Sequence, residues 1–430
     1  MTPAARVSGA IEVLADIEAR RRPAPDALKD WGLAHRFAGS GDRAAIASLV
    51  YDALRRKASG AWLVGEATPR AAMIGSLRLA RELSADAVAA LFSGERFAPA
   101  PLSKTERAGL DRTLDGAPPH VAGDVPDWIA PSLERAFGPD LVAECAALAA
   151  RAPLDLRVNV AKVDRDRVAA ELSDLAPVPT PHSPWGLRVP LGPDGRGPSI
   201  QSDPVFLRGE IEIQDEGSQL AAWLTGARPG ETVVDLCAGG GGKTLALAAV
   251  MAGSGRLVAT DADPRRLAPI HARLQRAGAT SVEVRTPRGK SDPLADLDGA
   301  ADLVLVDAPC TGTGTWRRNP DAKWRLRPGS LSLRLSEQAK VLDRAARLVR
   351  PGGRIAYVTC SVLPEENDDA VAALLHRHRA FEVVPADEVL RDVGAGALAS
   401  AVRLTRYGLQ MTPLRTGTDG FYVACLRHQS

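Results

Sequence analysis

The sequence predicts an α/β protein in three parts: an all-α domain over residues 1–115, a small α/β module over 128–212 and a larger α/β domain over 213–430. The first part has apolar residues at helical spacing and no stretch that alternates like a strand. From residue 231 onward, short apolar runs alternate with helical segments, which predicts a mostly parallel sheet with helices on both faces. A length of 430 residues also favours more than one hydrophobic core.

The composition is that of a folded globular protein, with 45% apolar and 25% charged residues. A net charge of +2 excludes a polycation but allows a local basic patch. No stretch reaches the roughly 18–20 apolar residues that a membrane span needs. The first 22 residues include three acidic ones, which is unlike the core of a signal peptide. We therefore expect a cytoplasmic monomer without a membrane partner.

The cysteine pattern argues against disulfides and bound metal. There are five cysteines, an odd number, and no two of them form a CxxC pair. This spacing predicts neither a disulfide framework nor a structural zinc site, and it suits a reducing compartment.

Three helices are predicted in the N-terminal part, over residues 5–17, 43–57 and 84–92, and Ser84 is the expected cap of the third. Residues 115–126 hold three prolines and two glycines, which is typical of a linker.

The small module begins with one or two helices over 128–150. Between residues 154 and 160 apolar and polar residues alternate, which predicts a strand with one face exposed, carrying Asp155 and Arg157. A short helix over 164–175 follows, and the proline- and glycine-rich stretch 177–204 is expected to hold irregular strands.

Seven strands are predicted in the larger domain. They cover residues 232–236, 256–260, 281–285, 302–306, 354–358, 381–384 and 421–426. In open parallel sheets the ligand lies beyond the carboxyl ends of the strands, so the loops after these strands are the candidate site.

The loop after the first of these strands is rich in glycine and opens a helix. Glycines let the backbone approach a ligand closely, and helix amides can point at it. The loop fits neither the Walker A pattern nor GxGxxG. A tight turn is the alternative, but it would need only one glycine. The candidate cofactor-binding residues are Cys237, Ala238, Gly239, Gly240, Gly241, Gly242 and Lys243.

A carboxylate follows the next strand. Asp261 lies about twenty residues after the glycine loop, where dinucleotide folds hold a ribose hydroxyl. The alternative role is a helix cap, which Asp263 before Pro264 fits better.

Two cysteines follow two other strands, Cys310 after Asp307 and Cys360 after Thr359. If these strands are neighbours, their ends lie roughly 5 Å apart, and two thiols and a carboxylate face one crevice. A lone cysteine at a strand end is usually a small buried apolar residue, and that interpretation is kept for Cys145 and Cys425.

Residues 311–350 carry ten basic and three acidic residues, a net charge of +7. Within the stretch 316–327, tryptophans alternate with basic residues, a pattern suited to base stacking and phosphate contact. We predict RNA binding by Arg317, Arg318 and Lys323. Much of 331–349 is instead expected to be a solvated helix face.

Four segments resemble successive motifs of the Nop/Sun-type RNA cytosine-C5 methyltransferases, which use S-adenosylmethionine. They read DLCAGGGGKT, TDAD, DAPCTGTGTWRRNPDAKW and GGRIAYVTCSVLPEEN. The resemblance implies a class I methyltransferase domain with a Rossmann-like seven-stranded sheet. The N-terminal helices resemble the NusB-like RNA-binding domain of the bacterial ribosomal-RNA branch, and residues 153–159 resemble the start of its small RRM-like module.

The resemblance also implies roles for the site residues. Cys360 would be the nucleophile that adds to carbon 6 of cytosine, Cys310 would assist breakdown of the adduct, and Asp307 would contact the base and the cofactor. Lys243 and the glycine loop would hold the methionine end of S-adenosylmethionine, with Asp261 on its ribose.

Two departures from the family pattern concern the cofactor. The family's loop usually reads CAAPGGKT, and Gly239 and Gly240 replace its second alanine and its proline. The family often has an acidic residue near the adenine, where this chain has Thr286, so Thr286 is expected to accept the adenine hydrogen bond or the cofactor is held more weakly.

The implied function is methylation of carbon 5 of a cytosine in RNA, with small-subunit ribosomal RNA favoured. One alternative is transfer RNA as the substrate. Another is a non-catalytic RNA-binding assembly factor with a vestigial methyltransferase fold. The residues alone do not say which thiol attacks.

Overall fold

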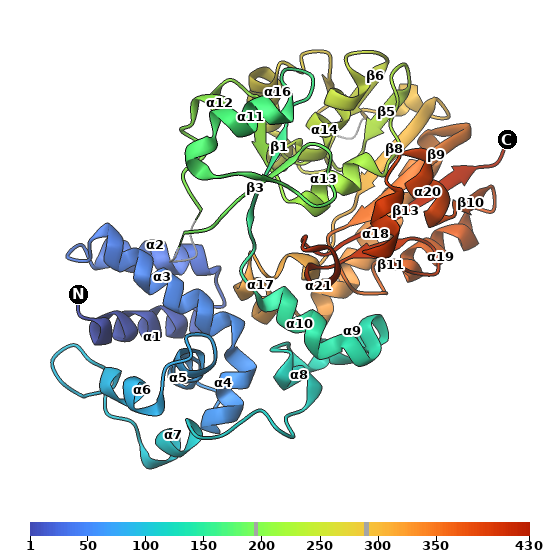
Figure 1. The fold of residues 1–430 in the computed structure, drawn as a ribbon. Coiled ribbons are helices and arrows are strands. Elements are labelled where there is room, and N and C mark those ends of the chain that lie inside the picture. Colours follow the sequence, from blue (N-terminus) through green and yellow to red (C-terminus); the bar gives the residue numbers. More distant parts are fainter. Residues whose placement is uncertain (193–196, 288–291) are drawn as a thin grey trace. The chain divides into compact units, whose positions relative to one another are not determined.

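The computed structural model describes residues 1–192, 197–287 and 292–430. The chain forms two compact units (Figure 1). One contains residues 1–150 and 316–328, and the other contains 151–315 and 329–430.

The first unit is helical. Its α-helices are α1 (Pro3–Arg20), α2 (Ala24–Ala34), α3 (Ser40–Arg55), α4 (Lys57–Val64), α5 (Pro69–Leu79), α6 (Ala85–Leu91), α7 (Lys104–Gly109), α8 (Pro119–Ala122), α9 (Ala130–Phe137), α10 (Leu141–Ala149) and α17 (Pro320–Arg325). Two short 3-10 helices, η1 (Asp127–Ile129) and η2 (Gly138–Asp140), flank α9. Buried residues of α1, α3 and α5 supply most of its core.

The three predicted N-terminal helices are confirmed as α1, α3 and α6. The Ser84 side chain accepts a hydrogen bond from the Ala87 amide, as a helix cap does. Residues 115–126 include α8, and the helices over 128–150 lie in the first compact unit. The division into three domains, with the small module over 128–212, stays a prediction.

A distant segment completes this helical unit. Residues 316–328 pack among its helices, with Trp316 1% exposed and Trp324 against the core. The Trp324 indole N–H donates to the Leu54 carbonyl at 2.6 Å, and Arg55 donates to the Arg317 carbonyl at 2.9 Å. The segment is therefore an integral part of the helical core.

The second unit begins with a small antiparallel sheet of order β2-β3-β1-β4. Its strands and helices are β1 (Leu154–Val158), α11 (Arg165–Glu171), β2 (Val178–Pro179), β3 (Gly186–Val189), α12 (Pro204–Leu207) and β4 (Ile211–Ile213), with η3 (Ser173–Leu175) after α11. β1 is predicted correctly, but its polar face is buried: Asp155 is 1% and Arg157 3% exposed. Both side chains are paired with polar groups of other elements, which is why their burial is tolerated.

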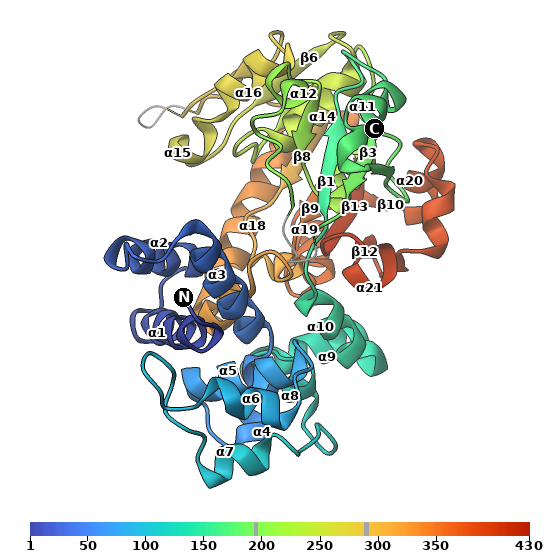
Figure 2. The ribbon, with the colours of Figure 1, turned by 60° about the vertical axis from the view of Figure 1, so that its left-hand side comes forward.

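Among the described residues, the main sheet has nine strands, eight of them in the order β11-β12-β13-β9-β8-β5-β6-β7, and β10 pairs with β13. Figure 2 shows this sheet with β6, β8, β9, β10, β12 and β13 labelled. The strands are β5 (Thr232–Asp235), β6 (Arg256–Ala259), β7 (Glu283–Val284), β8 (Ala301–Asp307), β9 (Val349–Thr359), β10 (Phe381–Val384), β11 (Arg403–Leu404), β12 (Leu409–Met411) and β13 (Phe421–His428). β5 to β9 run parallel to one another, and β13 is antiparallel to β9.

All seven predicted strands of this domain are present, and the Rossmann-like α/β fold is confirmed. The short strands β11 and β12 were not predicted, because two or three residues give no measurable alternation.

Helices cover both faces of this sheet. Successive residues of a strand enter different cores: Val233 packs with α13 (Glu216–Trp223), α14 (Gly242–Met251) and α20 (Ala386–Asp392). Val234 packs with α18 (Pro328–Leu348) and α19 (Asp368–Arg377). The remaining helices are α15 (Pro264–Leu267), α16 (Ile270–Ala277), α21 (Pro413–Thr416), η4 (Ala295–Leu297), η5 (Thr313–Thr315) and η6 (Gly396–Ser400).

Over the described ranges, no helix combines the length and the apolar character that crossing a membrane requires.

Candidate active site

The candidate site lies at the carboxyl edge of the main sheet. β5, β6, β8 and β9 are adjacent and parallel, so the loops that follow them emerge at the same edge. β8 and β9 are paired, with Asp307 opposite Val358, as the predicted meeting of the two cysteine loops requires.

The two cysteines of these loops meet. The sulfur atoms of Cys310 and Cys360 lie 3.3 Å apart, and both residues are partly exposed. The pKa of Cys310 is raised well above its usual value by its hydrogen bond with Cys360, by burial of the sulfur, and by the charges of Cys360 and Glu366.

The backbone of the Cys310 loop supports Cys360 directly. The Gly314 amide donates to the Cys360 carbonyl at 2.9 Å, and the Gly420 amide donates to the Gly314 carbonyl at 2.8 Å. A Cβ atom on Gly314 would lie 2.1 Å from the Gly420 oxygen, so only glycine fits between these two segments.

The glycine loop turns sharply before α14. Gly241 has φ 82°, and a Cβ atom there would lie 2.5 Å from Cγ1 of Ile270. Two arginines hold the loop carbonyls: Arg273 donates to Gly240 at 2.7 Å, and Arg157 donates to Gly242 at 2.7 Å. Arg157 is not among the predicted site residues, because its position in an alternating strand suggested an exposed side chain.

Asp261 shapes the same loop. Its carboxylate accepts the Gly239 amide and the Asp263 amide, both at 2.9 Å. Asp263 caps α15 by accepting the Arg265 amide, as the sequence predicted. Asp261 is therefore not the helix cap, and its burial at the strand end leaves it directed at the glycine loop.

Lys243 links the glycine loop to the Cys310 loop. Its ammonium lies 2.6 Å from Oδ2 of Asp307 and 5.0 Å from the centre of the Phe421 ring. Beneath it, burial raises the pKa of Asp235 to about 7, although Thr244 donates a hydrogen bond to this carboxylate at 2.6 Å. Asp235 was not among the predicted site residues.

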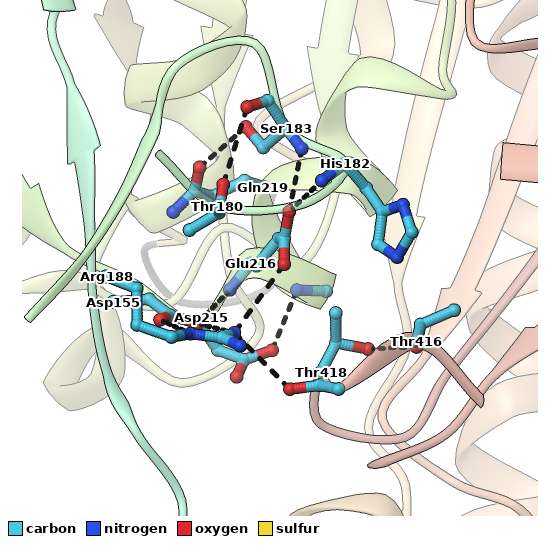
Figure 3. A network of polar contacts seen from close by, with 12 residues as sticks. Asp155, Thr180, His182, Ser183, Arg188, Asp215, Glu216, Gln219, Thr416 and Thr418 are labelled. Atoms are coloured by element: carbon cyan, nitrogen blue, oxygen red, sulfur yellow. Dashed lines mark hydrogen bonds and ion pairs between the residues drawn. The ribbon is translucent and has the colours of Figure 1, made fainter. Parts of the chain in front are cut away.

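A buried polar network beside α13 places the segment that leads to Phe421 (Figure 3). Arg188 is paired with Asp155 at 2.7 Å and donates to the Gly417 carbonyl at 3.3 Å. Asp215 accepts the Asp419 amide at 3.0 Å. These contacts tie the small sheet and α13 to the loop before β13, and that loop ends at the residue beneath Lys243.

The remaining predicted residues are accounted for as follows. Thr286 is partly exposed just after β7, and its neighbour Arg288 lies outside the described residues. Burial raises the pKa of Cys237 well above its usual value, with Asp235, Asp307 and Asp261 adding to the rise, so this thiol stays protonated. Burial likewise raises the pKa of Cys145 to about 12 and that of Cys425 to about 11, which fits their predicted structural roles.

The structure corrects part of the prediction that the basic segment 316–327 binds RNA. Arg317 is 4% and Lys323 2% exposed, and both lie within the helical unit. Lys323 has its ammonium 5.0 Å from the Trp324 ring centre, and burial lowers its pKa to about 8. Direct RNA contact by these two side chains is therefore not supported, whereas Arg318 is exposed.

Among the residues that the structure describes, no cluster of three or more histidine, cysteine or acidic side chains could hold a metal ion.

Comparison with known proteins identifies two matching families. Residues 222–427 match the family described as 16S rRNA methyltransferase RsmB/F. Residues 125–191 match the family described as a ferredoxin-like domain of RsmF/B-like methyltransferases. The second match therefore begins just before η1, in the helical unit, and ends after β3.

Two curated relatives are named as methyltransferases of small-subunit ribosomal RNA. A probable ribosomal RNA small subunit methyltransferase B of Synechocystis sp. is 32% identical over 70% of this chain and 66% of its own length. The ribosomal RNA small subunit methyltransferase B of Sodalis glossinidius is 34% identical over 70% of this chain and 64% of its own length. The chain thus covers slightly less than two thirds of these relatives. The solved structure of PH0851 has a TM-score of 0.70 and 25% identity over 99% of both chains.

Proposed function

Because the chain belongs to the RsmB/F family of methyltransferases, we propose that it transfers a methyl group from S-adenosylmethionine to carbon 5 of a cytosine in RNA. Small-subunit ribosomal RNA is the favoured substrate, since the curated relatives are named for it. The single observation that carries the chemistry is the 3.3 Å approach of the Cys310 and Cys360 sulfurs beside Asp307.

The residues of the glycine loop fit S-adenosylmethionine. The tight turn at Gly241 brings backbone amides to the carboxyl edge of the sheet, and the acidic Asp261 suits a ribose diol. We assign the methionine end to the loop and Lys243, the ribose to Asp261 and the adenine to the region of Thr286. When bound, S-adenosylmethionine supplies an electrophilic methyl group.

In this proposal Cys360 attacks carbon 6 of the ring as a thiolate. Its sulfur forms the new bond, and carbon 5 gains the nucleophilic character that methyl transfer needs. Asp307, whose Oδ2 contacts the Lys243 ammonium, is assigned to ring nitrogen 3, where its carboxyl group in the protonated form donates a hydrogen bond that offsets the negative charge developing on the ring. Cys310 keeps its proton at this stage, for the reasons that raise its pKa.

Breakdown of the adduct then falls to Cys310. The first cause that raises the Cys310 pKa is its hydrogen bond with Cys360, and the Cys360 charge adds to it. Once the Cys360 sulfur is bonded to carbon 6, it carries no charge, so both contributions disappear and Cys310 ionises more readily. Cys310 can then take the proton from carbon 5, and the bond between carbon 6 and Cys360 breaks.

A denaturing gel with RNA tests these roles. Cys360→Ala should abolish methyl transfer and give no adduct, whereas Cys310→Ala should accumulate a covalent protein–RNA adduct. An adduct that forms without Cys360 but requires Cys310 would reverse the two assignments.

Two measurements address the alternatives. Bisulfite sequencing of total RNA from a deletion strain distinguishes ribosomal from transfer RNA by showing which cytosine loses its methyl group. Calorimetric titration with S-adenosylmethionine tests the non-catalytic alternative, since an assembly factor with a vestigial fold would show no binding.

A further inference from the structure

Two consecutive residues that the proposed mechanism does not use lie behind the two cysteine loops. Glu366 and Asn367 are both buried, at 0% and 4% exposed, and directly precede α19. A buried carboxylate and a buried amide side by side call for an explanation, because each is costly unless its hydrogen bonds are satisfied.

Glu366 holds the loop of Cys310. Its Oε1 accepts the Thr311 amide at 2.8 Å, and its Oε2 accepts the Thr311 hydroxyl at 2.5 Å. Gln338 donates to Oε1 of Glu366 at 3.1 Å and to the Pro309 carbonyl at 2.9 Å. The residues on both sides of Cys310 are thus attached to one carboxylate, directly or through Gln338.

Asn367 holds the other loop in a similar way. Its Oδ1 accepts the Thr359 hydroxyl at 2.6 Å, and its Nδ2 donates to the Ser361 carbonyl at 3.0 Å. The same nitrogen donates to Gln410 at 3.0 Å. The residues on both sides of Cys360 are therefore attached to one amide.

The two residues that anchor the cysteine loops are adjacent in the sequence. Each cysteine is flanked by anchored neighbours, and the two anchors are joined by a single rigid peptide unit. The Tyr357 hydroxyl donates to the Glu366 carbonyl at 2.6 Å, which attaches this peptide to the interior of β9. The loops of Cys310 and Cys360 are thus both hydrogen-bonded to the same buried pair of residues, Glu366 and Asn367.

We infer that Glu366 and Asn367 are positioning residues with separate targets: Glu366 sets the geometry of Cys310 and Asn367 that of Cys360. This inference rests on the proposed function, because it uses the roles assigned there to the two thiols. Its consequence is that substitutions at two adjacent positions impair different halves of one reaction.

The test measures adduct formation and adduct breakdown separately, by a denaturing gel and by single-turnover methyl transfer to RNA. Glu366→Ala should retain the first methyl transfer and accumulate the adduct about tenfold, the loss expected on removing hydrogen bonds to a charged group. Asn367→Ala should lower the rate of adduct formation by about tenfold without accumulating adduct. Glu366→Gln keeps an acceptor for Thr311 and should restore breakdown to within about threefold of the wild type.

A matched control separates positioning from stability. Leu374→Ala creates a cavity in the α19 core without touching either loop, so it should lower the Tm and leave the ratio of adduct formation to breakdown unchanged. If Glu366→Ala does not fold, Gln338→Leu, which releases the Pro309 carbonyl, replaces it and should give the same accumulation of adduct.

The inference is overturned if the Glu366 and Asn367 variants impair both steps equally, or if they change the ratio no more than Leu374→Ala does. Failure of the proposed function has a different signature. In that case Cys310→Ala itself gives no adduct, whereas failure of the inference alone leaves the Cys310→Ala adduct in place.

Discussion

Lys243 and Asp307 form a close ion pair, with Nζ 2.6 Å from Oδ2, although one belongs to the glycine loop and the other ends β8. Lys243 is 7% exposed, and its ammonium also lies over the Phe421 ring. The group assigned to the cofactor is thus bonded to the group assigned to the base, so a change in one loop is transmitted to the other.

Lys243→Met should therefore weaken both functions. We expect cofactor affinity and the rate of methyl transfer each to fall by about tenfold, because Asp307 loses a partner with a strong charge-assisted hydrogen bond. Calorimetry and single-turnover assays measure the two effects. Lys340→Met, at an exposed position of α18, is the control and should change neither. A loss of catalysis with unaltered cofactor affinity would argue against the shared role.

Arg157 should matter for the cofactor rather than for RNA. It donates to the Gly242 carbonyl at 2.7 Å and to Gln214 at 2.5 Å, and burial lowers its pKa only to about 10, so it remains charged at pH 7. Arg157→Leu releases the glycine loop, and we expect about tenfold weaker binding of S-adenosylmethionine. Calorimetry measures this, and Arg167→Leu, on the exposed face of α11, should bind normally.

Lys323 should destabilise the helical unit through its charge. Its pKa falls from 10.5 to about 8 because of burial, so between about pH 8 and 10.5 the folded state holds fewer protons than the unfolded state. The free energy of unfolding should rise with pH across that window, by up to about 3 kcal/mol. Lys323→Met should remove this rise and leave the Tm at pH 7 unchanged or higher, since a buried charge is replaced by an apolar chain of similar size. A wild-type slope retained in Lys323→Met would contradict the assignment.

RNA binding by the basic segment should depend on its exposed arginines. Arg318 and Arg327 are exposed, whereas Lys323 is buried. Replacing both arginines with alanine should weaken RNA binding and reduce the slope of log affinity against log salt by about 1 to 2. Filter binding at several salt concentrations measures the slope. The same assay on Lys323→Met should match the wild type, and a reduced slope there would favour the original sequence-based interpretation.

Asp235 should give the second unit a pH dependence of opposite sign. Burial raises its pKa from 3.8 to about 7, so between about pH 4 and 7 the folded state holds a proton that the unfolded state has lost. The free energy of unfolding should fall as the pH rises through that window, by up to about 4 kcal/mol. Asp235→Asn keeps an acceptor for Thr244 and should flatten this part of the curve. Thermal melting of both proteins between pH 4.5 and 8 provides the comparison.

The sequence predicted the strand ends well and side-chain burial poorly. The motif residues Gly241, Asp307, Cys310 and Cys360 lie at one sheet edge, because alternation of strands and helices determines a parallel sheet and a parallel sheet determines where its loops emerge. Local patterns are sufficient for that inference.

The errors concern residues whose partners are distant in sequence. From the sequence, Arg157 is interpreted as an exposed strand residue. In the structure it donates a hydrogen bond to the carbonyl of Gly242, 85 residues away. From the sequence, Lys323 is interpreted as a solvated cation. In the structure it is buried among the helices of the N-terminal segment. The neighbouring residues in the sequence do not indicate that Arg157 or Lys323 is buried. The periodicity of apolar residues describes one helix or strand and not the element packed against it.

The contribution of residues 316–328 to the helical unit has a consequence for synthesis of the chain. A ribosome that has made the first 150 residues has not yet made Trp316 or Trp324, which fill and cover the helical core. The N-terminal helices therefore cannot complete their core, and part of their apolar surface stays uncovered, until residue 328 has emerged from the ribosome. Completion of this unit therefore requires a segment that is made only after β8 and the Cys310 loop, so its folding cannot be strictly vectorial.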